Sequence, residues 1–103
     1  MRITKSDVIQ TAADIADKNG LSNVSLKAVA ESLNIRTPSL YNHIDSLEAL
    51  LREIAHNGMK TMNERMMQAA IGKIGDNAIK SVGITYLNYM IEHPGIYETI
   101  QWA

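Results

Sequence analysis

The stretch from Ser25 to Ile44 constrains the fold most, because it has the signals of two short helices around a tight turn. The Ser25 hydroxyl can cap a first helix. Apolar residues then recur at helical spacing, at Leu26, Val29, Ala30 and Leu33. Asn34 suits the left-handed position that ends such a helix. Thr37 as a cap and Pro38 at the first helical position predict a second helix. Two helices across so short a turn are typical of a helix-turn-helix.

The second helix of this pair carries the polar side chains. The residues that would hold the two helices together are Leu33, Ile35, Leu40 and Ile44. The residues left to point elsewhere are Arg36, Thr37, Ser39, Tyr41, Asn42 and His43. The sequence therefore predicts a polar helix presented on an apolar support.

The rest of the chain also has helical periodicity, and we expect an all-α fold. The other expected helices run from the Thr4 cap to Gly20, from Leu47 to Ala70, from an Asp76 or Asn77 cap to His93, and onward from Pro94. The fifth expected helix, which ends at His93, would expose an apolar stripe if it were isolated, and the stripe therefore needs a partner. Its residues are Ile79, Val82, Tyr86 and Met90.

The segment NIRTPSLYNHIDSLEALL resembles the recognition-helix signature of TetR-type transcriptional regulators. Further residues fall where that family expects them, at Ala12, Ala13, Gly20, Leu33, Leu40, Tyr41, His43, Leu50 and Leu51. The resemblance covers roughly the first half of the chain. Two positions depart from it: Asn34 replaces the usual turn glycine, and Leu47 stands where many members carry a lysine near the DNA backbone.

The resemblance implies a three-helix DNA-binding bundle with a helix-turn-helix over residues 1–46. Residues 47–103 would be a connecting helix and the first helices of a regulatory domain. TetR-type regulators are usually about twice as long, so we expect a truncated chain. The implied protein is a ligand-responsive repressor that binds a palindromic operator as a homodimer, with a small-molecule effector in the distal half and most of the dimer interface in residues absent here.

The predicted DNA contacts are made by Ser25, Lys27, Arg36, Thr37, Pro38, Ser39, Tyr41, Asn42 and His43. Arg36 could form a forked contact with guanine, or meet only phosphate or solvent. Asn42 could pair with adenine or stay an exposed polar residue. By resemblance, Tyr41 donates to a phosphate; the alternative is a core tyrosine. Pro38 could pack on a thymine methyl or only start the helix, and Lys27 could meet phosphate or only water.

The balanced charge of the chain indicates that DNA binding would depend on a few well-placed side chains and not on a strongly basic surface. The chain has a formal net charge of −1, and residues 1–52 hold six basic and six acidic side chains. DNA binding would therefore depend on specific groups in a dimer. The balanced charge and Leu47 also leave an alternative open, a helical protein-interaction module that shares this fold and does not read DNA. No catalytic constellation supports an enzyme.

The remaining composition limits other functions. Without cysteine, disulfides and thiolate metal sites are unavailable, and we expect a cytoplasmic protein. No apolar run is long enough to span a membrane. Neither His56 nor His93 is followed by a second ligand three or four residues later, so no metal or cofactor is expected. Candidate effector-binding residues are Met59, Met62, Met66, Tyr86 and Met90, although ordinary packing against further helices is the better explanation of the methionines.

Overall fold

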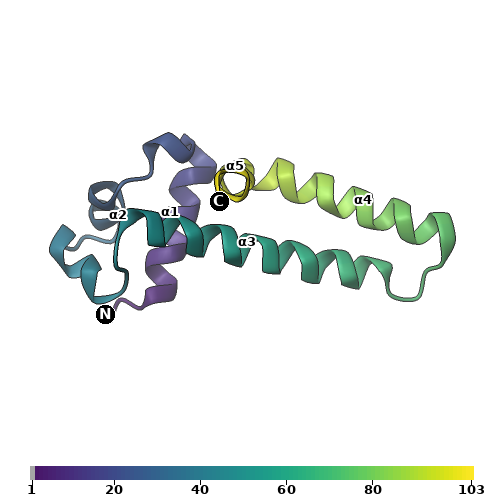
Figure 1. Ribbon diagram of the computed structural model, residues 1–103, viewed down its shortest axis with the longest axis horizontal. Helices are drawn as coiled ribbons and strands as arrows, with labels where there is room; N and C mark the ends of the chain where they lie inside the picture. Colours follow the sequence, from purple (N-terminus) through teal and green to yellow (C-terminus); the bar gives the residue numbers. More distant parts are fainter. Residues whose placement is uncertain (1) are drawn as a thin grey trace.

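The computed structural model describes residues 2–103, which form helices and turns without a strand. A small bundle continues into a long two-helix arm (Figure 1), and the molecule measures 52 × 25 × 21 Å. The elements in order are α1 (Lys5–Asn19), the 3-10 helix η1 (Leu21–Asn23), α2 (Leu26–Ser32), the 3-10 helix η2 (Thr37–Asn42), α3 (Leu47–Ala70), α4 (Gly75–Glu92) and α5 (Pro94–Trp102). The all-α prediction is confirmed.

Helix α1 begins after the predicted cap, and its buried apolar side chains form one side of the core. The Asp7 amide donates to Thr4 Oγ1 at 3.2 Å, and the Thr4 amide donates to the Asp7 carboxylate at 2.9 Å. This reciprocal pair satisfies two amides that a helix start leaves free. Gly20 ends the helix at φ 91° and ψ 155°. This positive φ is a conformation that favours glycine.

The predicted helix-turn-helix is present, with one change in its second member. The Ala28 amide donates to Ser25 Oγ at 3.0 Å, which confirms the cap of α2. Asn34 has φ 56°, as the turn prediction required. The second helix is η2, a 3-10 helix instead of an α-helix. Its capping position is Arg36, not Thr37, and no side chain caps it; Pro38 lies within the first turn, where an amide would lack a partner anyway.

Helix α3 runs from the bundle into the arm. The Ala49 amide donates to Ser46 Oγ at 3.1 Å, and the helix has the predicted bounds. Its first half is buried against α1, through Leu50, Leu51, Ile54 and Ala55. Its second half leaves the bundle and packs against α4 (Figure 1).

Helix α4 forms the other half of the arm and begins earlier than predicted. Its cap is Ile74, so the expected caps Asp76 and Asn77 both lie inside the first turn. The apolar stripe has the partner that the sequence required, because α4 packs against α3 and Val82, Tyr86 and Met90 are half-buried. The exposed apolar side chains of α4 are Ile79, Ile84, Leu87 and Ile91. None of the helices in the described part of the chain is long and apolar enough to cross a membrane.

Helix α5 returns the chain to the bundle and packs against both α1 and α3. Figure 1 shows it end-on beside α1, where the arm meets the bundle. Ile96 and Thr99 are buried, and Ile96 belongs to the main apolar core. The core therefore includes residues from both ends of the sequence.

Candidate nucleic-acid interface

The 3-10 geometry of η2 sorts its side chains into three rows. A 3-10 helix has about three residues per turn, so residues i and i+3 stand above one another. The turns close as this geometry requires, since the Ser39 amide donates to the Arg36 carbonyl and the His43 amide to the Leu40 carbonyl, both at 2.9 Å. The period of three decides which predicted contacts point outward.

The inward row holds η2 on the bundle. Leu40 is fully buried at its centre, and Thr37 and His43, three residues before and after, are half-buried. His43 also lines a small cavity of about 160 Å³ with Lys5, Asp45 and other residues. Thr37 and His43 are therefore less available to a ligand outside the bundle than their neighbours.

The two other rows carry most of the polar surface. One row contains Pro38 and Tyr41, which are both exposed, with 56% of the Tyr41 surface accessible. The other row contains Arg36, Ser39 and Asn42, of which only Ser39 is half-buried. An exposed cation, a phenol and a carboxamide on one short element are suited to phosphate and base-edge contacts.

Helix α2 places two further predicted contacts near the turn. Lys27 is exposed, and Ser25 is half-buried with its oxygen accepting from the Ala28 amide. The Ser25 hydroxyl proton stays available for donation, because a hydroxyl both donates and accepts. Among residues 2–103, neither Lys27 nor Arg36 forms an ion pair. Both cations are thus free to meet an anion.

The candidate effector-binding residues are spread over the arm. Met66 lines a groove of about 400 Å³ between α3 and α4, together with Met67, Ala70 and Val82. Met59 is exposed in a separate groove along α3, and Met62 packs against the main core. Within residues 2–103, the structure therefore does not bring these candidates together around a single cavity.

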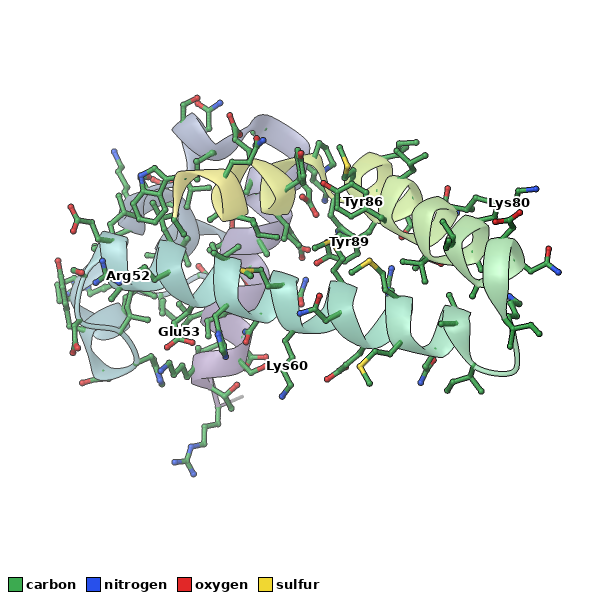
Figure 2. The ribbon with its side chains drawn as sticks, turned by 45° about the vertical axis from the view of Figure 1, so that its right-hand side comes forward. Arg52, Glu53, Lys60, Lys80, Tyr86 and Tyr89 are labelled. Carbon is green, nitrogen blue, oxygen red and sulfur yellow. The ribbon has the colours of Figure 1, made fainter. Side chains whose placement is uncertain are left out.

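Two tyrosines join the arm to the bundle (Figure 2). The Tyr86 hydroxyl donates to the Tyr97 hydroxyl at 3.5 Å, and this hydrogen bond is the main cause that raises the pKa of Tyr86 above 10.0. Burial raises the pKa of Tyr89, an effect that the nearby Arg65 partly offsets. Both phenols therefore stay protonated near neutral pH, and Tyr86 connects α4 to α5.

Sequence reasoning missed a polar cluster where α5 meets α1. Asp17 accepts hydrogen bonds from His93 and from the amides of Gly95 and Ile96. The sequence placed His93 only at a helix end, and these residues lie more than seventy positions from Asp17. The available signal was His93-Pro94-Gly95, which marks a helix start that needs an acceptor. Within the described residues, no group of three His, Asp or Glu side chains could hold a metal ion.

The two short helices, the tight turn between them and the outward polar rows of η2 place this chain in the class of helix-turn-helix proteins. No protein-family model matches the chain. The chain is 38% identical to YobS of Bacillus subtilis, an uncharacterized HTH-type transcriptional regulator, over 96 residues that make up 93% of this chain and 50% of YobS. It is 28% identical to the uncharacterized HTH-type transcriptional regulator Rv0681 of Mycobacterium tuberculosis over 93% of this chain and 44% of Rv0681.

A third relative is the HTH-type transcriptional regulator UidR of Escherichia coli, which is 27% identical over 86% of this chain and 40% of UidR. The chain thus spans about half the length of the curated relatives it matches. All three relatives are named HTH-type transcriptional regulators.

Proposed function

We propose that this chain reads DNA as part of a ligand-responsive transcriptional repressor of the TetR type. The observation that carries the proposal is the period of three in η2, which turns Arg36, Pro38, Tyr41 and Asn42 outward around the buried Leu40 anchor. The names of the relatives support a regulator, and the TetR-type signature NIRTPSLYNHIDSLEALL supports the finer assignment.

The contacts divide into two kinds with different consequences. Lys27, Tyr41 and the Ser25 hydroxyl meet phosphates, which fixes position without reading sequence. Arg36 and Asn42 face base edges in the major groove, where an arginine forks onto guanine and an asparagine onto adenine. Thr37, Ser39 and His43 play a smaller part, because they are half-buried.

The two-part organisation supplies the regulation. Residues 1–46 read DNA, and residues 47–103 begin the part that binds a small molecule and forms a homodimer. In the dimer the two η2 elements lie about 34–36 Å apart, one turn of the duplex. Because α3 is continuous from the core into the arm, a ligand on the arm that favours one position of α3 changes this spacing. Met66 on the α3–α4 groove is the best placed of the effector-binding candidates, which also include Met59, Met62, Tyr86 and Met90.

Replacing Lys27 with alanine should weaken binding to every DNA sequence. Loss of one phosphate contact in each subunit makes the negative slope of log K against log salt concentration shallower by about one per subunit. Binding of a duplex from the region upstream of the coding sequence, measured by fluorescence anisotropy at several salt concentrations, gives this slope. Lys80→Ala is the matched control, because Lys80 is exposed at the far end of α4 and points away from the bundle (Figure 2). An equal loss for both variants would contradict the assigned interface.

Replacing Arg36 with alanine should instead relax the choice of one base pair in each half-site. A forked contact discriminates against the wrong base by about 1–3 kcal/mol. Selection of binding sites from randomised duplexes, followed by affinities for the selected and substituted sites, measures this effect. Tyr41→Ala provides the comparison, since loss of a phosphate contact lowers affinity for all sites alike. The same uniform loss for Arg36→Ala would show that Arg36 touches only the backbone.

A protein-interaction module is the second candidate function. Leu47, where the family often has a cation, is half-buried and packs against the core, so it offers no phosphate contact. The salt titration separates the two functions, because a module that does not bind the duplex would show no salt slope.

A further inference from the structure

The cluster around Asp17 joins two helices that are far apart in the sequence. One carboxylate oxygen of Asp17 accepts from the amides of Gly95 and Ile96, both at 2.9 Å. The other oxygen lies 2.7 Å from His93 Nδ1. Because a carboxylate accepts only, Nδ1 carries the proton and donates it. The Asp17 and His93 side chains are 15% and 30% exposed, so water competes little for these bonds.

The backbone of α5 is also pressed against α1. A Cβ atom added at Gly95 would lie 1.9 Å from the carbonyl carbon of Ala16, so only glycine permits this approach. On the next turn, the Glu98 carboxylate accepts from the Leu21 amide at 2.8 Å. Helix α5 therefore has polar and steric contacts with the DNA-reading half at both α1 and η1.

Helix α5 is likewise seated on the first half of α3. A Cβ atom at Gly58 would lie 2.4 Å from Ile96 Cγ2, which shows how closely these two helices pack. Helix α4, in contrast, runs beside α3 along the arm (Figure 1), reaches the main core through Tyr89 near its end, and keeps several other apolar side chains exposed. The helices α4 and α5 are consecutive, but α5 is the better anchored of the two.

A row of contacts leads from this cluster into the arm. The His93 ring lies 4.9 Å from the Tyr89 ring, and the Arg65 guanidinium lies 5.4 Å from the centre of the same Tyr89 ring. Arg65 also pairs with Glu92 at 3.4 Å. His93 is therefore in contact with α1 through Asp17 and with the arm through Tyr89.

We propose that Asp17 is a positioning residue that fixes α5 to α1, so that α5 moves with the DNA-reading half and the joint of the molecule lies at His93–Pro94. The boundary predicted from the sequence, after residue 46, divides the chain differently. With α5 fixed, a displacement of α4 is transmitted to α1 through His93. This coupling adds to the one through α3, which runs from the core into the arm. The consequence for DNA binding rests on the proposed function, whereas the mechanical part does not.

Asp17→Ala should release the amino end of α5. Loss of a charged acceptor shared by two amides should raise their hydrogen-exchange rates about 10- to 100-fold at Gly95 and Ile96. Exchange followed by NMR on the whole chain measures both amides, and far-UV circular dichroism checks that the helices persist. Asp14→Ala is the matched control, because Asp14 lies on the same helix, is exposed and, among residues 2–103, accepts a side-chain hydrogen bond only from Gln10. Unchanged rates at Gly95 and Ile96 in Asp17→Ala would overturn the proposal.

Distances between spin labels test directly whether α4 moves relative to α1 and α5 about the joint at His93–Pro94. The chain has no cysteine, so one label at Lys18→Cys can be combined with a second at Gln101→Cys on α5 or at Lys80→Cys on α4. The α1–α5 distance distribution should be narrower than the α1–α4 distribution, and Asp17→Ala should broaden the first. Asp17→Asn should broaden it less, because the amide keeps one acceptor oxygen; this variant replaces Asp17→Ala if the latter unfolds. An α1–α5 distribution as broad as the α1–α4 one in the unsubstituted chain would overturn the joint.

Affinity for the upstream duplex separates the mechanical role of Asp17 from its consequence for DNA binding. If the chain binds DNA and α5 is fixed by Asp17, Asp17→Ala should lower the affinity while Asp14→Ala leaves it unchanged. If the chain binds no duplex, the proposed function fails, but the exchange rates and label distances still decide whether Asp17 fixes α5. If Asp17→Ala loosens α5 without any change in DNA affinity, the route from α5 to DNA is excluded.

Discussion

Gly95→Ala is expected to destabilise the folded chain by about 3 kcal/mol or more, at or above the upper end of the usual cost of overpacking. The added methyl group would lie 1.9 Å from the Ala16 carbonyl carbon and 2.0 Å from its oxygen. These are backbone atoms of α1 and cannot move aside as a flexible side chain does. Helix α5 must therefore shift away from α1 and weaken the hydrogen bonds to Asp17. Urea denaturation followed by circular dichroism measures the free energy of unfolding.

Gly83→Ala is the matched control for this prediction. A Cβ atom at Gly83 meets nothing within 4 Å, and Gly83 is an exposed residue inside α4. Alanine lowers the free energy of an exposed helical position by about 0.5–1 kcal/mol relative to glycine. The same substitution should thus have opposite signs at two glycines twelve residues apart. Destabilisation of similar size at both positions would show that the contact with Ala16 is not the cause.

Local signals predicted most of the fold, because capping and breaking residues act over a few positions. Ser46 and the apolar spacing that follows it gave α3 its bounds, and Thr4 with Asp7 gave the start of α1. The start of α4 was misplaced because the helix begins at Gly75 without a side-chain cap. A helix that begins without a cap has no sequence signal of the kind used for the others.

The candidate interface was located by the sequence, but its orientation was not. Thr37 and Pro38 predicted where the second helix would start, and η2 does begin at Thr37. Assigning this element as an α-helix, however, hid the period of three that separates the buried row from the exposed ones. The contact between Asp17 and His93 was out of reach, because it depends on how α5 packs across α1 in three dimensions. No local pattern specifies a partner so distant in the sequence.

Leu40→Ala should cost about 2–5 kcal/mol of stability, the range for truncating a buried leucine. Leu40 is the fully buried side chain of η2 and the centre of its inward row. Its loss leaves a cavity under a six-residue element that has few other anchors, so η2 should come away from the bundle before the other helices unfold. We therefore expect DNA affinity to fall further than the fraction of folded protein. Denaturation by urea gives the stability, and anisotropy on the upstream duplex gives the affinity.

Leu87→Ala makes the same change at a position where it should matter little. Leu87 is 54% exposed on α4, far from η2, and a surface substitution of this kind changes stability by about 0.5 kcal/mol or less. Because both variants lose the same atoms, the difference between them measures the burial of Leu40 alone. If Leu40→Ala proved as mild as Leu87→Ala, Leu40 would not anchor η2. The assignment of Arg36, Tyr41 and Asn42 to the outward rows would then be wrong, since those rows are defined by their position relative to Leu40.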